Sequence, residues 1–160
     1  MTANLQKKKK KGYEWLCLLQ EIDAGACLAD DMGLGKTLQT ICFLAKQLGL
    51  QENKKALVVC PASLLHNWKA ELQRFAPALS AVVYHDAGRE LGRCFDDPTA
   101  AILITSYGTL RSDIDLLSVI EWEVVVLDES HTIKNPSAQI TRAVWQLRAR
   151  SRIALSGTPV

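Results

Sequence analysis

Ala26-Cys-Leu-Ala-Asp-Asp-Met-Gly-Leu-Gly-Lys-Thr-Leu-Gln-Thr40 is the stretch that decides the fold. It opens with a short apolar run, Ala26–Ala29, which predicts a buried strand. A loop with two glycines and a lysine follows, and a helical pattern begins at Thr37. A strand, a glycine-rich loop and a helix in this order are the structural setting of a phosphate-binding P-loop.

The chemistry of this loop follows from its expected geometry. Backbone N–H groups from Gly33 to Thr37 can point into one concavity, where the positive end of the following helix also attracts phosphate. Lys36 would reach the β- and γ-phosphates, and the Thr37 hydroxyl would bind Mg²⁺. Asp30 stands where the consensus has its first glycine. The alternative is an ordinary strand-to-helix turn with a solvated lysine.

Length and composition describe one globular domain. The 160 residues, 48% of them hydrophobic and 22% charged, are enough to bury a substantial core. No apolar run approaches the roughly 20 residues that cross a bilayer, and the N-terminus lacks the apolar core of a signal peptide. We therefore expect no membrane partner. The net charge of +2 is too small to indicate nucleic-acid binding without local features.

The cysteines indicate a reducing, intracellular compartment. Their number is odd, and they form no C-x-x-C pair. Several lie inside apolar segments, which predicts buried free thiols, with metal or disulfide roles as the alternative. The five are Cys17, Cys27, Cys42, Cys60 and Cys94.

The first eleven residues differ from the rest. Lys7–Lys11 is an uninterrupted run of like charges, which predicts a disordered basic leader over residues 1–11, with phosphate contact to a nucleic acid as the alternative. From Tyr13 to Ile22 apolar residues recur at helical spacing, which predicts a short amphipathic helix. The domain is therefore expected to span residues 12–160.

The rest of the chain alternates strand-like runs with helical stretches. The runs are continuously apolar, as in strands covered on both faces, which predicts an α/β fold of three layers with a mostly parallel sheet and helices on both faces. Ligands of such sheets bind beyond the carboxyl ends of the strands. After Ala26–Ala29 the expected strands are Ala56–Cys60, Ala81–His85, Ala101–Thr105, Val124–Leu127 and Arg152–Leu155, and the expected helices are 37–48, 63–75, 107–117 and 137–149.

Two of these strand ends carry candidate site residues. Asp128 and Glu129 follow the run Val124–Leu127, where Asp128 can hold Mg²⁺ and Glu129 can orient or deprotonate a water that attacks the γ-phosphate. His131, two residues after Glu129, could contact groups that sense the γ-phosphate, with a plain surface residue as the alternative. Ser156-Gly-Thr-Pro159 ends the last run and suits a coupling element, with a simple turn as the alternative.

Taken together, the motifs resemble those of the first RecA-like lobe of the Swi/Snf family of helicase-like ATPases, within the second helicase superfamily. The resemblance covers residues 12–160, and Asp30 in place of the first P-loop glycine is itself typical of the family. In chain order the motifs are Asp31-Met-Gly-Leu-Gly-Lys-Thr37, Val59-Cys-Pro-Ala-Ser-Leu-Leu-His-Asn-Trp68, Ile104-Thr-Ser-Tyr107, Asp128-Glu-Ser-His131 with Ile133-Lys-Asn-Pro136, and Leu155-Ser-Gly-Thr-Pro159.

The resemblance implies a RecA-like P-loop NTPase lobe that uses ATP and Mg²⁺ to move along double-stranded DNA. Its ATP-binding residues would be Asp31, Met32, Gly33, Leu34, Gly35, Lys36 and Thr37. Thr37 and Asp128 would hold the metal, and Lys36, Asp128 and Glu129 would be catalytic, with Glu129 as the base. The DNA backbone would be contacted at Pro61, Ala62, Ser63, Thr105, Ser106 and Tyr107. Coupling between nucleotide and lobe movement would involve His131, Ser156, Gly157 and Thr158.

The partners implied are a C-terminal helicase lobe and, in some family members, DNA-bound proteins such as nucleosomes or polymerase. The location would be nuclear in a eukaryote and the cytoplasm or nucleoid in a bacterium. Lys9 stands where the family has the glutamine of a Leu-Arg-Pro-Tyr-Gln-like stretch, which leaves adenine selection open.

The chain stops at Val160, before any second lobe with its arginines. Because an arginine finger supplies about 10³–10⁵ in turnover, we expect the lone lobe to bind nucleotide weakly and to hydrolyse little. A truncated, non-catalytic nucleotide- or DNA-binding interaction module is the alternative. A GTPase would show Asn-Lys-x-Asp, but Asn53-Lys-Lys-Ala56 lacks the aspartate, and no arginine-rich lid of a small-molecule kinase stands out.

Overall fold

The computed structural model describes residues 26–29, 36–49, 53–95, 100–130 and 139–156. Its described strands form one six-stranded sheet in the order β1-β6-β5-β2-β4-β3, and every neighbouring pair is parallel. The predicted parallel α/β architecture is therefore confirmed. The strands are β1 (Ala26–Ala29), β2 (Ala56–Cys60), β3 (Ser80–Val83), β4 (Ala100–Ser106), β5 (Glu121–Leu127) and β6 (Arg148–Ser156).

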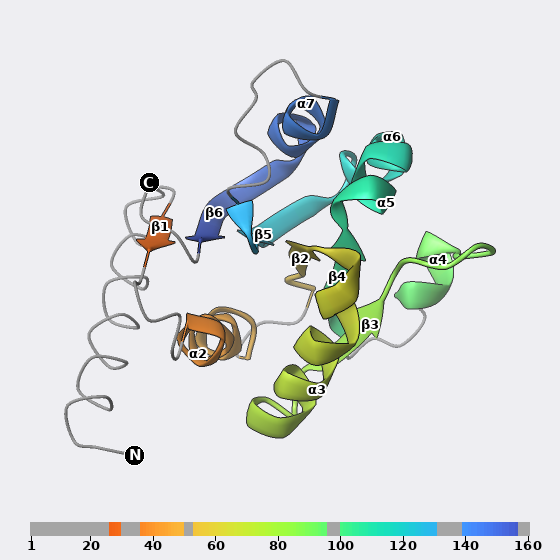
Figure 1. Cartoon of the computed structure of the whole chain (residues 1–160). Helices are drawn as coiled ribbons and strands as arrows, with labels where there is room; N and C mark the ends of the chain where they lie inside the picture. The colour runs from red at the N-terminus through yellow and green to blue at the C-terminus, as the bar shows by residue number, and fades with distance from the viewer. Residues whose placement is uncertain (1–25, 30–35, 50–52, 96–99, 131–138, 157–160) are drawn as a thin grey trace.

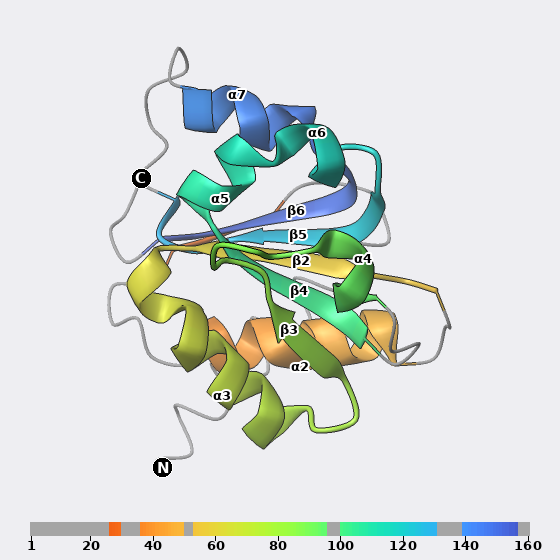
Figure 2. The same cartoon turned by 90° about the vertical axis from the view of Figure 1, so that its right-hand side faces the viewer.

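Helices cover both faces of the sheet, which gives three layers (Figures 1 and 2). In Figure 2, α2 and α3 lie below the sheet, whereas α5, α6 and α7 lie above it. This division follows from the crossovers, because the chain moves outward from β1 to β3 and then returns through β5 to β6. The helices are α2 (Lys36–Leu48), η1 (Ala62–Leu64, a 3₁₀ turn), α3 (Leu65–Phe75), α4 (Leu91–Cys94), α5 (Tyr107–Ser112), α6 (Ile114–Leu117) and α7 (Gln139–Gln146).

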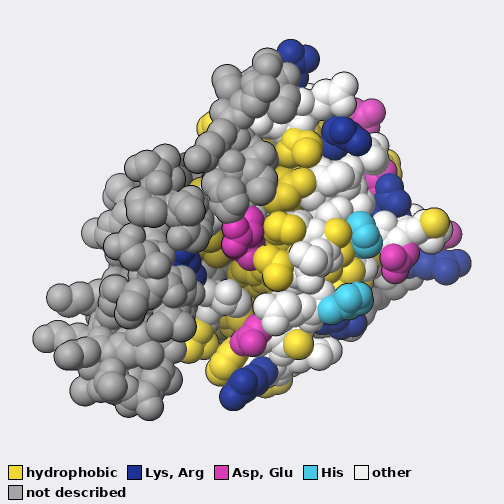
Figure 3. All heavy atoms as spheres, viewed as in Figure 1, with side chains coloured by type: hydrophobic (Ala, Val, Ile, Leu, Met, Phe, Trp, Pro, Cys, Tyr) yellow, Lys and Arg dark blue, Asp and Glu magenta, His cyan; other side chains and the backbone are white. Residues whose placement is uncertain are grey.

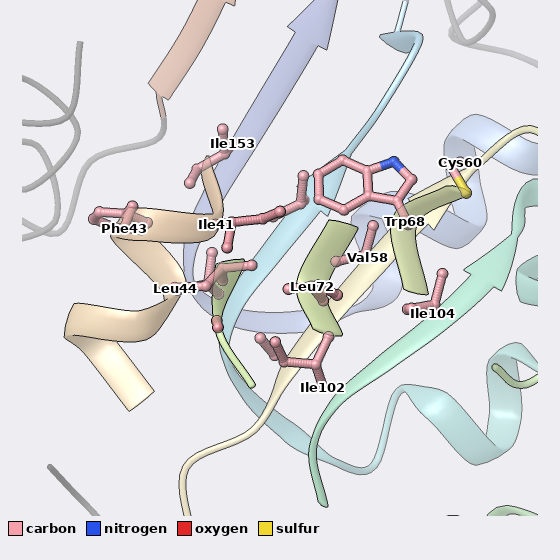
Figure 4. Close-up of a cluster of buried hydrophobic side chains, with 14 of the residues drawn as sticks. Ile41, Phe43, Leu44, Val58, Cys60, Trp68, Leu72, Ile102, Ile104 and Ile153 are labelled. Carbon is pink, nitrogen blue, oxygen red and sulfur yellow. The ribbon is translucent and has the colours of Figure 1, made fainter. Parts of the chain in front are cut away.

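The core below the sheet is built from α2, α3 and alternate strand residues (Figure 4). Ile41 and Leu44 of α2 and Leu72 of α3 have no exposed surface. Each such side chain contributes about 1.5–3 kcal/mol through burial. Trp68 of α3 is 1% exposed and packs in the same cluster, near the carboxyl end of β2.

A second core fills the space above the sheet. Val125 and Leu127 of β5 pack there with Leu110 of α5 and Val144 of α7. Trp122, at the amino end of β5, is 2% exposed, and its indole N–H donates to the carbonyl of Leu117 over 3.1 Å. The strands are therefore covered on both faces, as their continuous apolar runs predict.

The register of the sheet brings the strand ends to one edge. Ala29 pairs with Ser156, Leu127 pairs with Ala154, and Cys60 pairs with Ser106. The carboxyl ends of β1, β6, β5, β2 and β4 are therefore neighbours along this edge, which is the expected ligand position in such a sheet. Figures 1 and 3 look onto this edge.

Two predicted helices were wrong in their extent. The helix expected over 137–149 ends at Gln146, because β6 begins at Arg148 and pairs with Glu121 of β5. Opposite charges at this cross-strand position favour the strand. The stretch 107–117 is two helices divided at Asp113, whose side chain is bound by Tyr84 and Arg89.

Several strand bounds also differ from the sequence prediction. β3 runs from Ser80 to Val83 rather than from 81 to 85, and β5 begins at Glu121 rather than at 124. The polar segment before Pro98 contains α4, which was not predicted. No helix in the part of the chain that the structure describes is long and apolar enough to cross a membrane. The leader, the expected helix at 13–22 and Lys9 lie outside the described residues.

Candidate functional site

Lys36 begins α2, the helix that follows β1 in the chain. It is the first residue of that helix and is only 6% exposed, and Thr37 beside it is half-buried. A buried lysine at a helix N-terminus concentrates positive charge beyond the end of the sheet, a setting that suits a phosphate. The loop residues 31–35 and the coupling residues His131, Gly157 and Thr158 lie outside the described residues, and Ser156 is described as the end of β6.

Asp128 is held from several directions at the end of β5. Its backbone N–H donates to the carbonyl of Val59 over 2.8 Å, which continues the ladder between β5 and β2. The indole N–H of Trp68 donates to Asp128 Oδ2 over 2.8 Å, and the Tyr107 hydroxyl donates to the Asp128 carbonyl over 2.6 Å. Trp68 comes from the layer below the sheet and Tyr107 from the layer above it.

Glu129 follows Asp128 with a left-handed backbone, at a φ of 52°. For a residue other than glycine this conformation costs about 1–3 kcal/mol and persists where the surroundings impose it. The backbone N–H of Glu129 donates to Asp128 Oδ1 over 2.9 Å, and this hydrogen bond ties the main chain of Glu129 to the side chain of Asp128. The half-buried Glu129 side chain therefore leaves the strand in a defined direction.

The donor set at Asp128 fits Mg²⁺. Each carboxylate oxygen carries two lone pairs. The Glu129 N–H uses one on Oδ1 and the Trp68 indole uses one on Oδ2, so both oxygens keep capacity for a metal or its water. Mg²⁺ is usually held by one or two carboxylates together with substrate phosphates. Among the described residues no cluster of three or more His, Cys, Asp or Glu side chains offers a different metal site.

The cysteines match their sequence prediction only in part. Cys60 is buried, and burial together with the nearby charge of Asp128 raises the pKa of its thiol to about 12. Cys42, expected to be buried, is exposed, because it occupies the outward face of α2 between the buried Ile41 and Phe43. Cys94 is half-buried, and the side chains of Cys17 and Cys27 lie outside the description.

The segment Pro61–Ser63 lies on the surface at the carboxyl end of β2. Ala62 and Ser63 are exposed in η1, and Pro61 is half-buried. No side chain caps η1 or α3, but the N–H groups of Leu64 and Leu65 donate to the carbonyls of Pro61 and Ala62, which leaves the N–H groups of Ala62 and Ser63 for an anion. The sequence prediction that this segment contacts DNA stays a prediction.

Thr105, Ser106 and Tyr107 lie deeper than Pro61–Ser63. They are 0%, 5% and 7% exposed, respectively. The Thr105 hydroxyl donates to the carbonyl of Tyr84 over 2.8 Å, and Ser106 Oγ accepts from the Thr109 N–H over 3.2 Å as the N-cap of α5. Their hydroxyls are thus engaged within the protein, and the exposed position beside them is Gly108.

A polar cluster next to this segment was not predicted from the sequence. Arg89 makes a bidentate pair with Asp113, with Nε–Oδ2 at 2.7 Å and Nη2–Oδ1 at 3.0 Å, and the Tyr84 hydroxyl donates to Oδ2 over 2.6 Å. His85 Nδ1 lies 3.0 Å from Thr109 Oγ1. The cluster ties the loop after β3 to α5. Its one sequence signal is the polar stretch 85–90 after a strand-like run.

The Arg89–Asp113 pair predicts how stability responds to acid. Hydrogen bonds from Arg89, and also from Tyr84, lower the pKa of the Asp113 carboxyl against the opposing effect of burial. A lowered folded-state pKa gives stability that is present above the unfolded value of about 3.9 and is lost as pH falls through the folded value. Asp113→Asn should therefore be less stable than the wild type at neutral pH, with the difference shrinking below about pH 4. Urea unfolding at pH 7 and pH 3 measures this, and a constant difference would contradict it.

Residues 8–160 match the SNF2-related domain family. The chain belongs to this family. The SNF2-related domain is 40% identical over 171 residues to the TATA-binding protein-associated factor mot1 of Aspergillus fumigatus, covering 99% of this chain and 9% of that protein. It is 42% identical over 162 residues to the putative ATP-dependent helicase/translocase YwqA of Bacillus subtilis, covering 99% of this chain and 18% of that protein.

Solved structures resemble the SNF2-related domain closely. The Sulfolobus solfataricus SWI2/SNF2 ATPase core in complex with dsDNA superimposes with a TM-score of 0.84 at 41% identity, over 95% of this chain and 31% of that chain. The ATPase core domain from the same organism gives a TM-score of 0.82 over the whole of this chain and 32% of that chain. The fold of the domain is thus the RecA-like fold of these cores, and the chain spans less than a third of each.

Sequence reasoning missed the role of Trp68 at this site. The residue stands in a motif that carries the family resemblance, yet no contact was assigned to it. Leu65, Trp68 and Leu72 recur at helical spacing and mark the inward face of α3. A buried indole N–H needs an acceptor, which is the signal that points toward a polar group at a strand end.

Proposed function

We propose that this SNF2-related domain is the ATP-binding lobe of a DNA-dependent ATPase that moves along double-stranded DNA. The observation that carries the proposal is the arrangement of Lys36 and Asp128 at the same edge of one parallel sheet, with Asp128 held by Trp68 and Tyr107. P-loop NTPases place a phosphate-binding lysine and a metal-binding aspartate at this edge.

In this proposal each residue has a separate task. Lys36 neutralises the β- and γ-phosphates from the N-terminus of α2, and Thr37 and Asp128 hold Mg²⁺, which supplies charge neutralisation at the phosphates when bound. Glu129 orients the attacking water and takes its proton, a role that its fixed backbone supports. Together they favour a nucleoside triphosphate as ligand.

The assignment of DNA as the track rests on the relatives and on the surface around Pro61. The Sulfolobus core is described in complex with dsDNA. In this chain the uncapped N–H groups of η1 suit a phosphate of the DNA backbone. Figure 3 shows lysine and arginine side chains mainly toward the margin of the described face.

The domain is proposed to work with a second lobe, since it spans 9% and 18% of the two relatives named above. Arginines from such a lobe would complete the site, and the domain alone would hydrolyse ATP slowly. The alternative function, a non-catalytic nucleotide- or DNA-binding interaction module, would keep the fold without turnover.

A binding titration tests the nucleotide site directly. Residues 1–160 should bind a fluorescent ATP analogue weakly but saturably in the presence of Mg²⁺, and Lys36→Ala should weaken this binding at least about tenfold, since a hydrogen bond to a charged group is lost. Lys46→Ala, at the opposite end of the same helix, is the matched control and should bind like the wild type. Absence of saturable binding, or equal binding by Lys36→Ala, would refute the proposed site.

A further inference from the structure

Asp128 is contacted by two side chains that arrive from opposite layers of the fold. Trp68 belongs to α3 below the sheet, and its indole N–H reaches Oδ2 over 2.8 Å. Tyr107 is the first residue of α5 above the sheet, and its hydroxyl reaches the Asp128 carbonyl over 2.6 Å. One bond fixes the carboxylate and the other fixes the main chain of the same residue.

Both helices begin beside the segments proposed to meet DNA. α3 follows η1 directly, so the exposed Ala62 and Ser63 lie within two turns of Trp68. α5 begins with Tyr107 itself, and the exposed Gly108 is the next residue. DNA bound against either of these surface segments would act on a helix whose first turn contacts Asp128.

The two side chains are themselves closed to direct DNA contact. Trp68 is 1% exposed and Tyr107 is 7% exposed, and each has its polar atom committed to residue 128. The rest of Trp68 packs with Ile41 and Leu72 in the lower core (Figure 4). Any effect of these residues on a DNA-linked activity must therefore pass through Asp128 and the adjoining Glu129.

We infer that Trp68 and Tyr107 are positioning residues that link the two DNA-facing helix starts to the carboxylates of the ATPase site. The inference rests on the proposed function and names the contacts through which DNA would regulate that site. In this arrangement DNA binding at η1 or at the start of α5 selects the orientation of Asp128, and Asp128 in turn holds the Glu129 N–H through Oδ1. Hydrolysis would then be faster while DNA occupies either segment than in its absence.

Conservative variants in a chain that includes the second lobe test this link. Trp68→Phe removes the indole donor and Tyr107→Phe removes the hydroxyl, and both keep an aromatic ring. We expect affinity for duplex DNA to be unchanged, whereas the ratio of DNA-stimulated to basal ATP hydrolysis falls about tenfold for Trp68→Phe and about three- to tenfold for Tyr107→Phe. In the double variant the stimulation ratio should fall by less than the product of the two single-variant factors, because both side chains act on residue 128.

Matched controls separate this effect from simple loss of stability. Trp122→Phe removes an equally buried indole donor, which bonds to the Leu117 carbonyl, and Tyr84→Phe removes a buried hydroxyl that bonds to Asp113. Neither partner lies at Asp128. Both controls should keep the wild-type stimulation ratio, whatever they do to the melting temperature.

Hydrogen exchange gives a readout that does not depend on turnover. Duplex DNA should slow exchange in peptides that cover residues 124–130 in the wild type and in Trp122→Phe, but not in Trp68→Phe. If both Trp68→Phe and Tyr107→Phe keep the wild-type stimulation ratio and the wild-type protection from exchange, this inference is overturned and the proposed function still stands. A wild-type protein that shows no response to DNA would overturn the proposed function and this inference with it.

Discussion

Glu129→Gln, in a chain that includes the second lobe, should lower the rate of ATP hydrolysis by about 10²- to 10⁴-fold, the usual contribution of a general base. The amide keeps the size of the side chain but cannot take a proton from water. Because Gln can adopt the same backbone and keep the N–H bond to Asp128 Oδ1, the site should remain assembled. A phosphate-release assay measures the rate, and nucleotide binding should stay near the wild-type value.

Glu121→Gln is the matched control for this substitution. Glu121 is an exposed carboxylate on the same strand, but it lies at the amino end of β5, the opposite edge of the sheet from Asp128. Its loss should leave the rate of hydrolysis unchanged. Retention of more than about a tenth of the wild-type rate by Glu129→Gln would remove Glu129 from the role of base.

Trp122→Ala should destabilise the domain by about 3–5 kcal/mol, the usual cost of emptying a buried aromatic site. The indole is 2% exposed, packs against Phe95 in a tilted arrangement with ring centroids 6.3 Å apart, and donates to the Leu117 carbonyl. The substitution opens a cavity and leaves that carbonyl without its donor. Since small domains are stable by about 5–15 kcal/mol, urea unfolding should show a large shift of the midpoint.

Trp145→Ala provides the comparison on the surface. Trp145 is 71% exposed on α7, and the Arg152 guanidinium lies over its ring, 5.7 Å from the ring centroid. Its loss should cost less than about 1 kcal/mol, since exposed cation–π contacts contribute little. An equal loss of unfolding free energy in Trp122→Ala and Trp145→Ala would mean that the upper core is not packed around Trp122.

The sequence was sufficient for the layers of the fold because its strands are continuously apolar. Val124 to Leu127, covered on both faces in the structure, could hardly belong to anything but a central strand. The ends of the elements were harder to predict. Residues 147–149 continue a helical pattern, and the strand pairing of Arg148 with Glu121 overrides it. Pairing partners distant in the chain are invisible to local periodicity.

The sequence identifies candidate residues for the site but not the contacts that hold them. Lys36, Asp128 and Glu129 were identified as candidates because residue type and strand-end position narrow the possibilities. The contacts of Trp68 and Tyr107 with Asp128 span 60 and 21 residues of sequence. They arise from two helices meeting one strand from opposite faces, which spacing alone does not reveal. The hydroxyl of the buried Thr105 likewise donates to the carbonyl of Tyr84, the residue that follows β3.

The most direct test of the central claim is the rate of ATP hydrolysis, with and without duplex DNA, by a chain that joins this SNF2-related domain to its second lobe. The proposed motor should hydrolyse ATP slowly alone and much faster with DNA, and Lys36→Ala should abolish both rates. Residues 1–160 alone should show little turnover in either condition. A joined chain that hydrolyses no ATP, or hydrolyses it at the same rate with and without DNA, would contradict the account and favour the interaction module.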